Sequence, residues 1–306
     1  MSSFTLRQLE YFIACAELGS MRAASEQVHL TQSAISTAIA DLEKHLGVQL
    51  LIRHARGLSL TQAGARVLAD ARRLMGSVDD LHASARDIGQ ALTGGLRIGC
   101  YSTIAPILLP RVVDDFTSTH PEVKLDIIEG SQVQLEEELR SGSCEVVLAY
   151  AYAATGAELP PDLEARVVRS APPHLVLSAE HPLAHRKRVR LADVVDEPLI
   201  LFDLPPGGEY FVQIFTEAGL APNIRFRTQS FETARSLVAR GLGYTILTQQ
   251  TSVSESYEGF GLVTRELDES LPELDIVLLR LAGLQPTRRA EAFVEQCLTS
   301  LVQHDM

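Results

Sequence analysis

Residues 31–37 read TQSAIST, and from these seven residues the fold of the N-terminal part of the chain can be predicted. This stretch opens a helix in which apolar residues recur at helical spacing from Ile35 to Leu46. The opposite face carries short, uncharged polar groups, which can approach base edges and phosphates closely. The alternative is a helix start that is merely rich in capping residues. We favour the first interpretation and predict DNA contacts from Thr31, Gln32, Ser33, Ser36 and Thr37.

The neighbouring segments fit this interpretation. One helix is predicted from Thr5 to Gly19, and a short second helix after Ser20 leads by a tight turn into the helix of residues 31–46. Two short helices joined in this way form the helix-turn-helix layout, in which the second helix enters the major groove. Strands at residues 50–53 and 58–61 then predict a hairpin, or wing. Its predicted contacts to phosphates or the minor groove are Arg53 and, at the tip, Arg56.

Residues 61–92 predict one long helix with a narrow apolar seam. The apolar positions follow one another at alternating intervals of four and three residues, namely Val67, Ala71, Leu74, Val78, Leu81, Ala85, Ile88 and Leu92. Such an alternation is typical of a coiled coil, and a helix with so narrow a stripe needs a partner. The alternative is packing on the globular part of the same chain. We expect a homodimer formed through Leu74, Val78, Leu81, Ala85 and Ile88.

Composition and charge limit the possible functions. The chain has 306 residues, of which 46% are hydrophobic, so two or three domains with apolar cores are expected. The net charge of -12 argues against a polyanionic partner for the chain as a whole, but the first 94 residues are balanced, with nine basic and nine acidic side chains. The four cysteines are scattered, and neither a signal peptide nor a membrane span is recognisable. We expect a cytoplasmic protein without a metal or cofactor.

From residue 96 onward, strands and helices alternate. The βαβαβ order of residues 96–149 implies a parallel sheet with helices on its faces, and a second set of elements follows, so two small α/β lobes are predicted. Ligands of such sheets gather at the carboxyl ends of strands, beside helix N-termini. Hydroxyl and aromatic side chains at those positions would suit a small carboxylate with an apolar body. The alternative is that the hydroxyl groups are ordinary helix caps and turn residues. The predicted effector-binding residues are Ser102, Thr103, Ser131, Phe202, Thr228 and Phe231.

Two other patterns do not support a functional site. The basic run at residues 185–190 resembles a nucleic-acid patch but lies in the effector half, so a solvated loop is the better interpretation. Cys100 and Cys144 could form a redox pair, yet nothing nearby in the sequence clearly lowers a thiol pKa.

The sequence resembles the LysR-type transcriptional regulators over essentially its whole length. The resemblance is carried by LRQLEYF at 6–12, AAS at 23–25, TQSAIS at 31–36 and LTQAG at 60–64, with weaker matches such as LVARGLG at 237–243. The sequence departs from the family pattern in three places. Leu51 replaces the usual Phe, Glu145-Val146 replaces a common Asp-Leu pair, and Thr248 replaces a frequent Pro. The last two departures weaken any inference about the ligand.

The resemblance implies an N-terminal winged helix-turn-helix, a long linker helix and a C-terminal two-lobe effector domain like that of periplasmic binding proteins. It places these parts at residues 1–61, 62–92 and 93–306, with lobe I at 93–167 and 267–306, and lobe II at 168–266. The chain would cross between lobes near Val167-Val168 and again near Val263 to Glu266. Expected partners are double-stranded operator DNA, a small-molecule effector, further copies in a dimer or tetramer, and RNA polymerase.

Two other classes of protein were weighed against a DNA-binding regulator. A solute-binding transport component would share the two lobes but needs export and leaves residues 1–92 unexplained. An enzyme lacks support, since the sequence has no Gly-rich phosphate loop, no metal-ligand cluster and no G-x-S-x-G elbow. We therefore expect a sequence-specific regulator and no catalytic residues.

Overall fold

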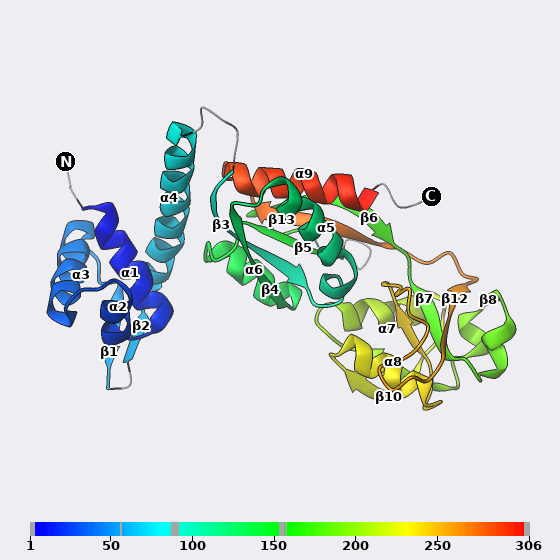
Figure 1. Ribbon diagram of the computed structural model, residues 1–306. Coiled ribbons are helices and arrows are strands. Elements are labelled where there is room, and N and C mark those ends of the chain that lie inside the picture. The colour runs from blue at the N-terminus through cyan, green and yellow to red at the C-terminus, as the bar shows by residue number, and fades with distance from the viewer. Residues whose placement is uncertain (1–3, 56, 87–91, 153–155, 157, 303–306) are drawn as a thin grey trace.

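The computed structural model describes three consecutive parts, namely a small N-terminal domain, a long helix and a two-lobe C-terminal domain (Figure 1). Lobe II lies at the end of the molecule away from the N-terminal domain (Figure 1). The residues that the structure describes are 4–55, 57–86, 92–152, 156 and 158–302.

The N-terminal domain is a winged helix-turn-helix, as predicted. Its elements are α1 (Leu6–Leu18), α2 (Met21–Gln27), α3 (Gln32–Leu46), β1 (Leu51–His54) and β2 (Gly57–Leu60). Thr5 and Gln8 form the capping box of α1, and Gly19 ends that helix with a left-handed φ of 58°. In the antiparallel hairpin, β1 begins and ends one residue later than predicted, and β2 begins and ends one residue earlier. Phe12, Ile35, Ile39, Leu42 and Leu50 are among its fully buried core residues.

The linker helix α4 (Gln62–Arg86) follows β2 directly. The Thr61 hydroxyl accepts a hydrogen bond from the Gly64 amide at 2.8 Å and so caps the helix. The first turns of α4 pack on the N-terminal domain, where Leu68 and Ala71 are buried in its core. Packing on the same chain therefore holds for the first turns of α4.

Lobe I is built on a five-stranded sheet. Its elements are β3 (Gly94–Tyr101), α5 (Ala105–Thr119), β4 (Val123–Gly130), α6 (Gln132–Arg140), β5 (Val146–Ala151), β6 (Leu163–Ala171), β13 (Leu274–Leu281) and α9 (Arg288–Val302). The strand order is β4-β3-β5-β13-β6. The first three strands are parallel, as predicted, whereas β13 runs antiparallel to both β5 and β6.

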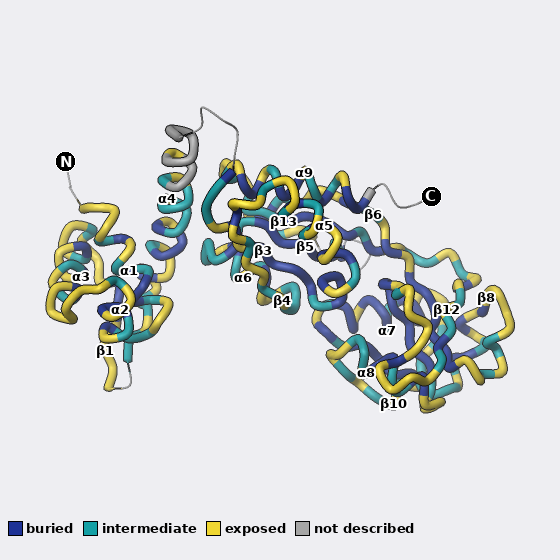
Figure 2. Tube along the Cα trace, viewed as in Figure 1, coloured by how far each residue is buried: buried dark blue, intermediate teal, exposed yellow. Residues whose placement is uncertain are grey.

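Lobe II contains a second, smaller α/β arrangement. Its elements are β7 (His174–Ser178), the 3-10 turns η2 (Pro182–His185) and η3 (Leu191–Asp193), β8 (Arg188–Val189), β9 (Pro198–Phe202), α7 (Gly207–Glu217), β10 (Asn223–Thr228), α8 (Phe231–Ala239), β11 (Thr245–Leu247) and β12 (Leu262–Leu267). Four strands have the order β11-β7-β12-β8, and β9 pairs in parallel with β10. Figure 2 shows buried strands in the interior of both lobes.

The two crossings between the lobes lie a few residues later than the sequence suggested. Strand β6 stays paired with β13 as far as Ala171, so the first crossing is at residues 172–173 and not at Val167-Val168. Strand β12 pairs with β7 in lobe II, so the second crossing follows Leu267 and does not fall within Val263 to Glu266. Both errors have one cause, because each predicted crossing is itself a strand whose partner is distant in the sequence.

Candidate DNA interface and effector site

The outer face of α3 presents the predicted DNA contacts to solvent. Thr31 caps the helix, because its hydroxyl accepts from the Ala34 amide at 3.2 Å. The Thr37 hydroxyl donates to the carbonyl oxygen of Ser33 at 3.0 Å. The hydroxyl groups of Thr31 and Thr37 therefore each already make a hydrogen bond to the backbone of the helix. Gln32 is exposed on the first turn of α3, and its long amide side chain can reach beyond the helix backbone.

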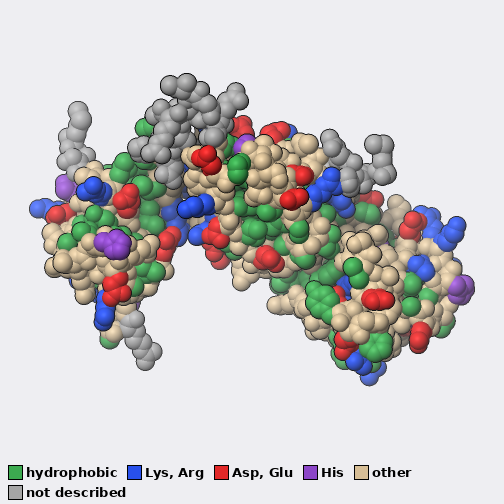
Figure 3. All heavy atoms as spheres, in the orientation of Figure 1, with side chains coloured by type: hydrophobic (Ala, Val, Ile, Leu, Met, Phe, Trp, Pro, Cys, Tyr) green, Lys and Arg blue, Asp and Glu red, His purple; other side chains and the backbone are tan. Residues whose placement is uncertain are grey.

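Arg53 of the wing strand β1 reaches across to α3. Its Nη2 donates to the Ser36 hydroxyl at 2.9 Å, so the predicted wing and helix residues meet in one surface. Arg56 lies outside the described residues. Figure 3 shows cationic, anionic and histidine side chains interspersed over the visible face of the N-terminal domain, in line with its balanced charge.

A small cavity lies between the two lobes, with only about 10 Å³ of water-accessible space. That is room for about one water molecule. Three of the six predicted effector residues line it, namely Thr103, Phe202 and Phe231. The other lining residues are Tyr101, Tyr150, Tyr152, Gly207, Phe211, Leu247, Thr248, Gln249 and Leu274.

The other three predicted effector residues make local bonds outside the cavity lining. The Ser102 hydroxyl donates to the carbonyl of Gly130 at 3.2 Å, and Ser131 caps α6. The Thr228 hydroxyl accepts from the amide of Ser230 at 3.2 Å. For these three residues the structure supports the alternative interpretation, in which they act as helix caps and turn residues.

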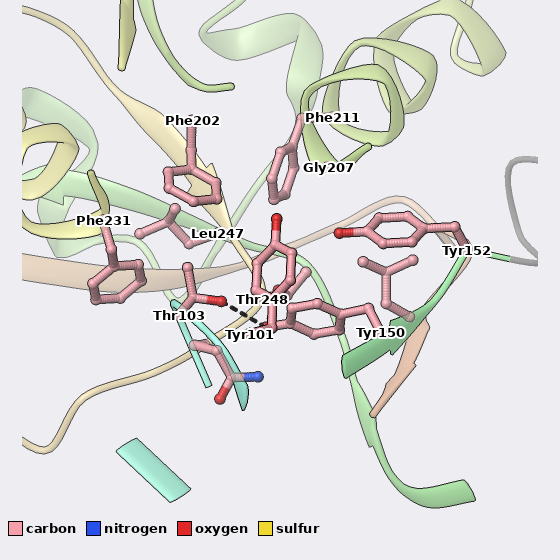
Figure 4. A pocket seen from close by; sticks show the side chains of 12 residues that line it. Tyr101, Thr103, Tyr150, Tyr152, Phe202, Gly207, Phe211, Phe231, Leu247 and Thr248 are labelled. Atoms are coloured by element: carbon pink, nitrogen blue, oxygen red, sulfur yellow. Dashed lines mark hydrogen bonds between the residues drawn. The ribbon is translucent and has the colours of Figure 1, made fainter. Parts of the chain in front are cut away.

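Hydrogen bonds of tyrosine side chains join the two lobes beside the cavity, whose lining side chains are drawn in Figure 4. The Tyr101 hydroxyl of lobe I donates to the Leu204 carbonyl of lobe II at 3.1 Å. The Thr248 hydroxyl of lobe II donates to the Tyr150 oxygen at 3.2 Å, and Thr103 lies 3.2 Å from the same oxygen. Burial raises the pKa of Tyr150, so its hydroxyl is neutral at physiological pH. The cavity is therefore lined by rings and uncharged hydroxyl groups.

Most of the aromatic residues in the cavity lining are not among the predicted effector residues. Tyr150 lies in β5 and Tyr152 directly follows that strand. Two tyrosines at alternate positions at the end of a parallel strand were a usable signal, since their rings point to the same side. Gln249 had no comparable signal in the sequence.

All four cysteines are buried. Burial raises the pKa of Cys15 to about 11 and that of Cys144 to about 12, and it also raises the pKa values of Cys100 and Cys297. A raised pKa keeps the unreactive thiol form at neutral pH, which agrees with rejecting a redox pair of Cys100 and Cys144.

We expect the native cysteines to react slowly with a chromogenic disulfide reagent. For Cys15 the shift from 9.0 to about 11 alone lowers the thiolate fraction at neutral pH by roughly a hundredfold. The test compares reaction rates of the native and urea-unfolded chain. A native thiol that reacts as fast as in the unfolded chain would contradict the expectation.

The arginines of the basic run at residues 185–190 pair with nearby carboxylates. Arg186 and Arg190 both pair with Asp193, and Arg188 pairs with Glu266 and Asp268. These pairs support the solvated-loop interpretation. Within the described ranges, no cluster of three or more His, Cys, Asp or Glu side chains could hold a metal ion, and no helix is long and apolar enough to span a membrane.

Comparison with known proteins agrees with this architecture. Residues 6–65 match the model of the bacterial regulatory helix-turn-helix protein, lysR family, and residues 89–301 match the LysR substrate binding domain. The HTH-type transcriptional regulator YvbU of Bacillus subtilis is 30% identical over 95% of this chain and 97% of its own. The DNA-binding transcriptional dual regulator OxyR of Escherichia coli is 33% identical over 79% of this chain and 78% of its own.

Solved structures lead to the same conclusion. The LysR family regulator HinK of Pseudomonas aeruginosa matches with a TM-score of 0.64 and 34% identity over 98% of this chain and 99% of its own. The predicted resemblance is thereby confirmed. The chain belongs to the LysR family of transcriptional regulators, in which a helix-turn-helix domain binds DNA under the control of an effector-binding domain.

Proposed function

We propose that the effector of this regulator binds between the two lobes, in an opened form of the cavity around Thr103 and Tyr150. The observation that supports this site most strongly is the set of hydrogen bonds across the cavity, because a ligand there would replace contacts between lobes. Binding at that position changes the relative placement of the lobes, which is how a small molecule can act on the rest of the assembly.

The lining favours a ligand with an apolar ring and at least one oxygen acceptor. Phe202, Phe211 and Phe231 supply ring faces, and the polar groups are hydroxyls and the amide of Gln249. The Nε2 of Gln249 is buried beside the Tyr150 hydroxyl, where it can donate a hydrogen bond to an acceptor oxygen of the ligand. No Lys, Arg or His is among the described lining residues, so a small carboxylate would rely on these neutral donors.

The other finer assignments also belong to this proposal. Two chains would pair along the exposed seam of α4 and place two copies of α3 on one operator. A tetramer of two dimers and contact with RNA polymerase follow from the family resemblance, and a cytoplasmic location follows from the sequence pattern; all three stay predictions. A relative from Pectobacterium carotovorum, 32% identical over 79% of this chain, carries the name hydrogen peroxide-inducible genes activator, but the buried thiols of this chain give no support for a peroxide response.

Thr103→Val is expected to raise the effector concentration needed for a response by roughly tenfold. The reason is the loss of a neutral hydrogen bond worth about 1–1.5 kcal/mol. The first step is a thermal-shift screen of the full chain with aromatic carboxylates, such as benzoate, and matched uncharged amides, such as benzamide. The compound that raises the melting temperature is then titrated against the variant.

Ser102→Ala is the matched control, because its hydroxyl bonds to Gly130 outside the cavity lining. Its titration should match wild type, and the operator affinity of both variants without effector should change little. If Thr103→Val and Ser102→Ala respond at the wild-type concentration, the ligand does not occupy this cavity.

A further inference from the structure

One side chain, that of Arg72 on α4, contacts all three parts of the chain. Its Nη2 donates to the Glu17 carboxylate of α1 at 3.0 Å. Its Nη1 donates to the Ser141 carbonyl at 3.1 Å and to the Ser143 hydroxyl at 2.6 Å, both in the turn that follows α6 of lobe I. The side chain is only 16% exposed. These contacts to Arg72 therefore link the DNA-binding domain, the linker helix and the effector domain.

The turn at residues 141–143 is shaped to receive α4. Gly142 has a φ of +64°, and a Cβ at this position would lie 3.0 Å from the carbonyl oxygen of Ala69. Both the backbone conformation and the close approach favour glycine. The hydroxyls of Ser141 and Ser143 lie 2.8 Å apart, which closes the turn beneath the guanidinium of Arg72.

The packing around Arg72 allows its hydrogen bonds to lobe I to break without disrupting an apolar core. The apolar core of the N-terminal domain and that of the effector domain are separate clusters. Between them lies an open groove of about 810 Å³, bordered by Leu74 and Met75 of α4 and by Arg97 and Leu284 of lobe I. Domains joined by limited polar contacts rather than a shared core move relative to each other unless something fixes them.

We propose that Arg72 is a releasable latch that sets the orientation of the winged helix-turn-helix relative to lobe I. Charge-assisted hydrogen bonds to Glu17, Ser141 and Ser143 hold one orientation, and movement of the turn frees the helix to swing into the groove. Two residues lie between the turn and β5, and this strand carries the cavity residue Tyr150 next to its last residue, Ala151. This proposal depends on the proposed function in one respect only, namely that the effector binds next to Tyr150 of β5.

The test measures the distance between two spin labels in the full-length chain, one at Lys44→Cys on α3 and one at Glu122→Cys in lobe I. Both positions are exposed, whereas the native cysteines are buried. Labelled chains are diluted with unlabelled ones so that only distances within one protomer are observed. Because no effector is added, failure of the latch is distinguishable from failure of the effector site.

Arg72→Ala is compared with Arg73→Ala, its neighbour on the same helix. Arg73 pairs with Asp70 within α4, so its removal deletes the same charge without touching lobe I. We expect a wild-type distance distribution for Arg73→Ala and a broader or displaced one for Arg72→Ala. Ser143→Ala removes one of the hydrogen bonds to Arg72 from the side of lobe I, so it should change the distance distribution in the same way but less. Because it leaves Arg72 in place, this variant provides a second test if Arg72→Ala misfolds.

The regulatory consequence is measured on an operator selected in vitro with the wild-type protein. We expect the operator affinity of Arg72→Ala to fall at least fivefold and that of Arg73→Ala to stay within twofold of wild type. Both variants should bind random DNA with the wild-type affinity. A wild-type distance distribution for Arg72→Ala and Ser143→Ala would overturn the latch. A changed distribution with unchanged operator affinity would overturn its regulatory role.

Discussion

Leu81→Asp is expected to convert the dimer into monomers. The structure leaves the middle of the α4 seam uncovered, with Leu81 67% exposed and Leu74 42% exposed. Val78, between them, is half-buried. If two copies pair along this seam, the substitution places two carboxylates face to face in a desolvated contact, which strongly disfavours association. Sedimentation at micromolar concentration measures the outcome.

Val253→Asp provides the control for adding a charge at an exposed apolar residue. Val253 is 60% exposed in lobe II, far along the chain from the seam. We expect this variant to keep the wild-type mass. A Leu81→Asp chain that sediments as the dimer would show that α4 is not the principal dimer contact. The predicted seam residue Ile88 and the side chain of Ala85 lie outside what the structure describes.

Loss of the dimer should also abolish tight operator binding. Two linked recognition helices bind two half-sites with an effective concentration that raises affinity by roughly 10²–10⁴-fold over one helix. The Leu81→Asp monomer should therefore lose about that factor on an in vitro selected operator. Its N-terminal domain keeps its own core, in which Leu68 and Ala71 of α4 are buried, so single half-site binding should persist.

The N-terminal domain could be predicted closely because its signals are local. Thr5, Ser20 and Thr31 accept hydrogen bonds from backbone amides a few residues away, and Gly19 and Gly47 end helices in the left-handed conformation. Hydrogen bonds of this kind join residues a few positions apart, so a short window of sequence is enough to predict them. The bounds of β1 and β2 were each displaced by one residue because strand register depends on the pairing between the two strands.

The effector domain was less predictable because its decisive contacts join distant residues. The cavity joins Tyr101 and Tyr150, which the pairing of β3 with β5 brings together, and Gln249, which the fold of lobe II adds from a distant segment. A serine or threonine before a helix has the same local pattern whether it binds a ligand or caps the helix. Thr103 and Ser102 are adjacent in sequence, yet Thr103 lines the cavity and Ser102 does not.

Gln32→Ala is expected to weaken specific operator binding by about 1–3 kcal/mol, roughly 5-fold to 150-fold, while binding to random DNA stays nearly unchanged. Gln32 is exposed on the first turn of α3, so its truncation leaves the core intact. Arg53→Ala should instead weaken binding to both operator and random DNA. It should also reduce the slope of log affinity against log salt concentration by about one, as expected for the loss of a phosphate contact. Titrations at several salt concentrations separate the two patterns.

Ser36→Ala should combine both effects, because the Ser36 hydroxyl accepts a hydrogen bond from Arg53 at 2.9 Å and so orients the guanidinium. A double-mutant cycle isolates this coupling. If Ser36 acts mainly through Arg53, its substitution costs less affinity in an Arg53→Ala background than in wild type. Additive losses would mean that Ser36 contacts DNA independently. Equal losses on operator and random DNA for Gln32→Ala would refute base reading by the exposed face of α3.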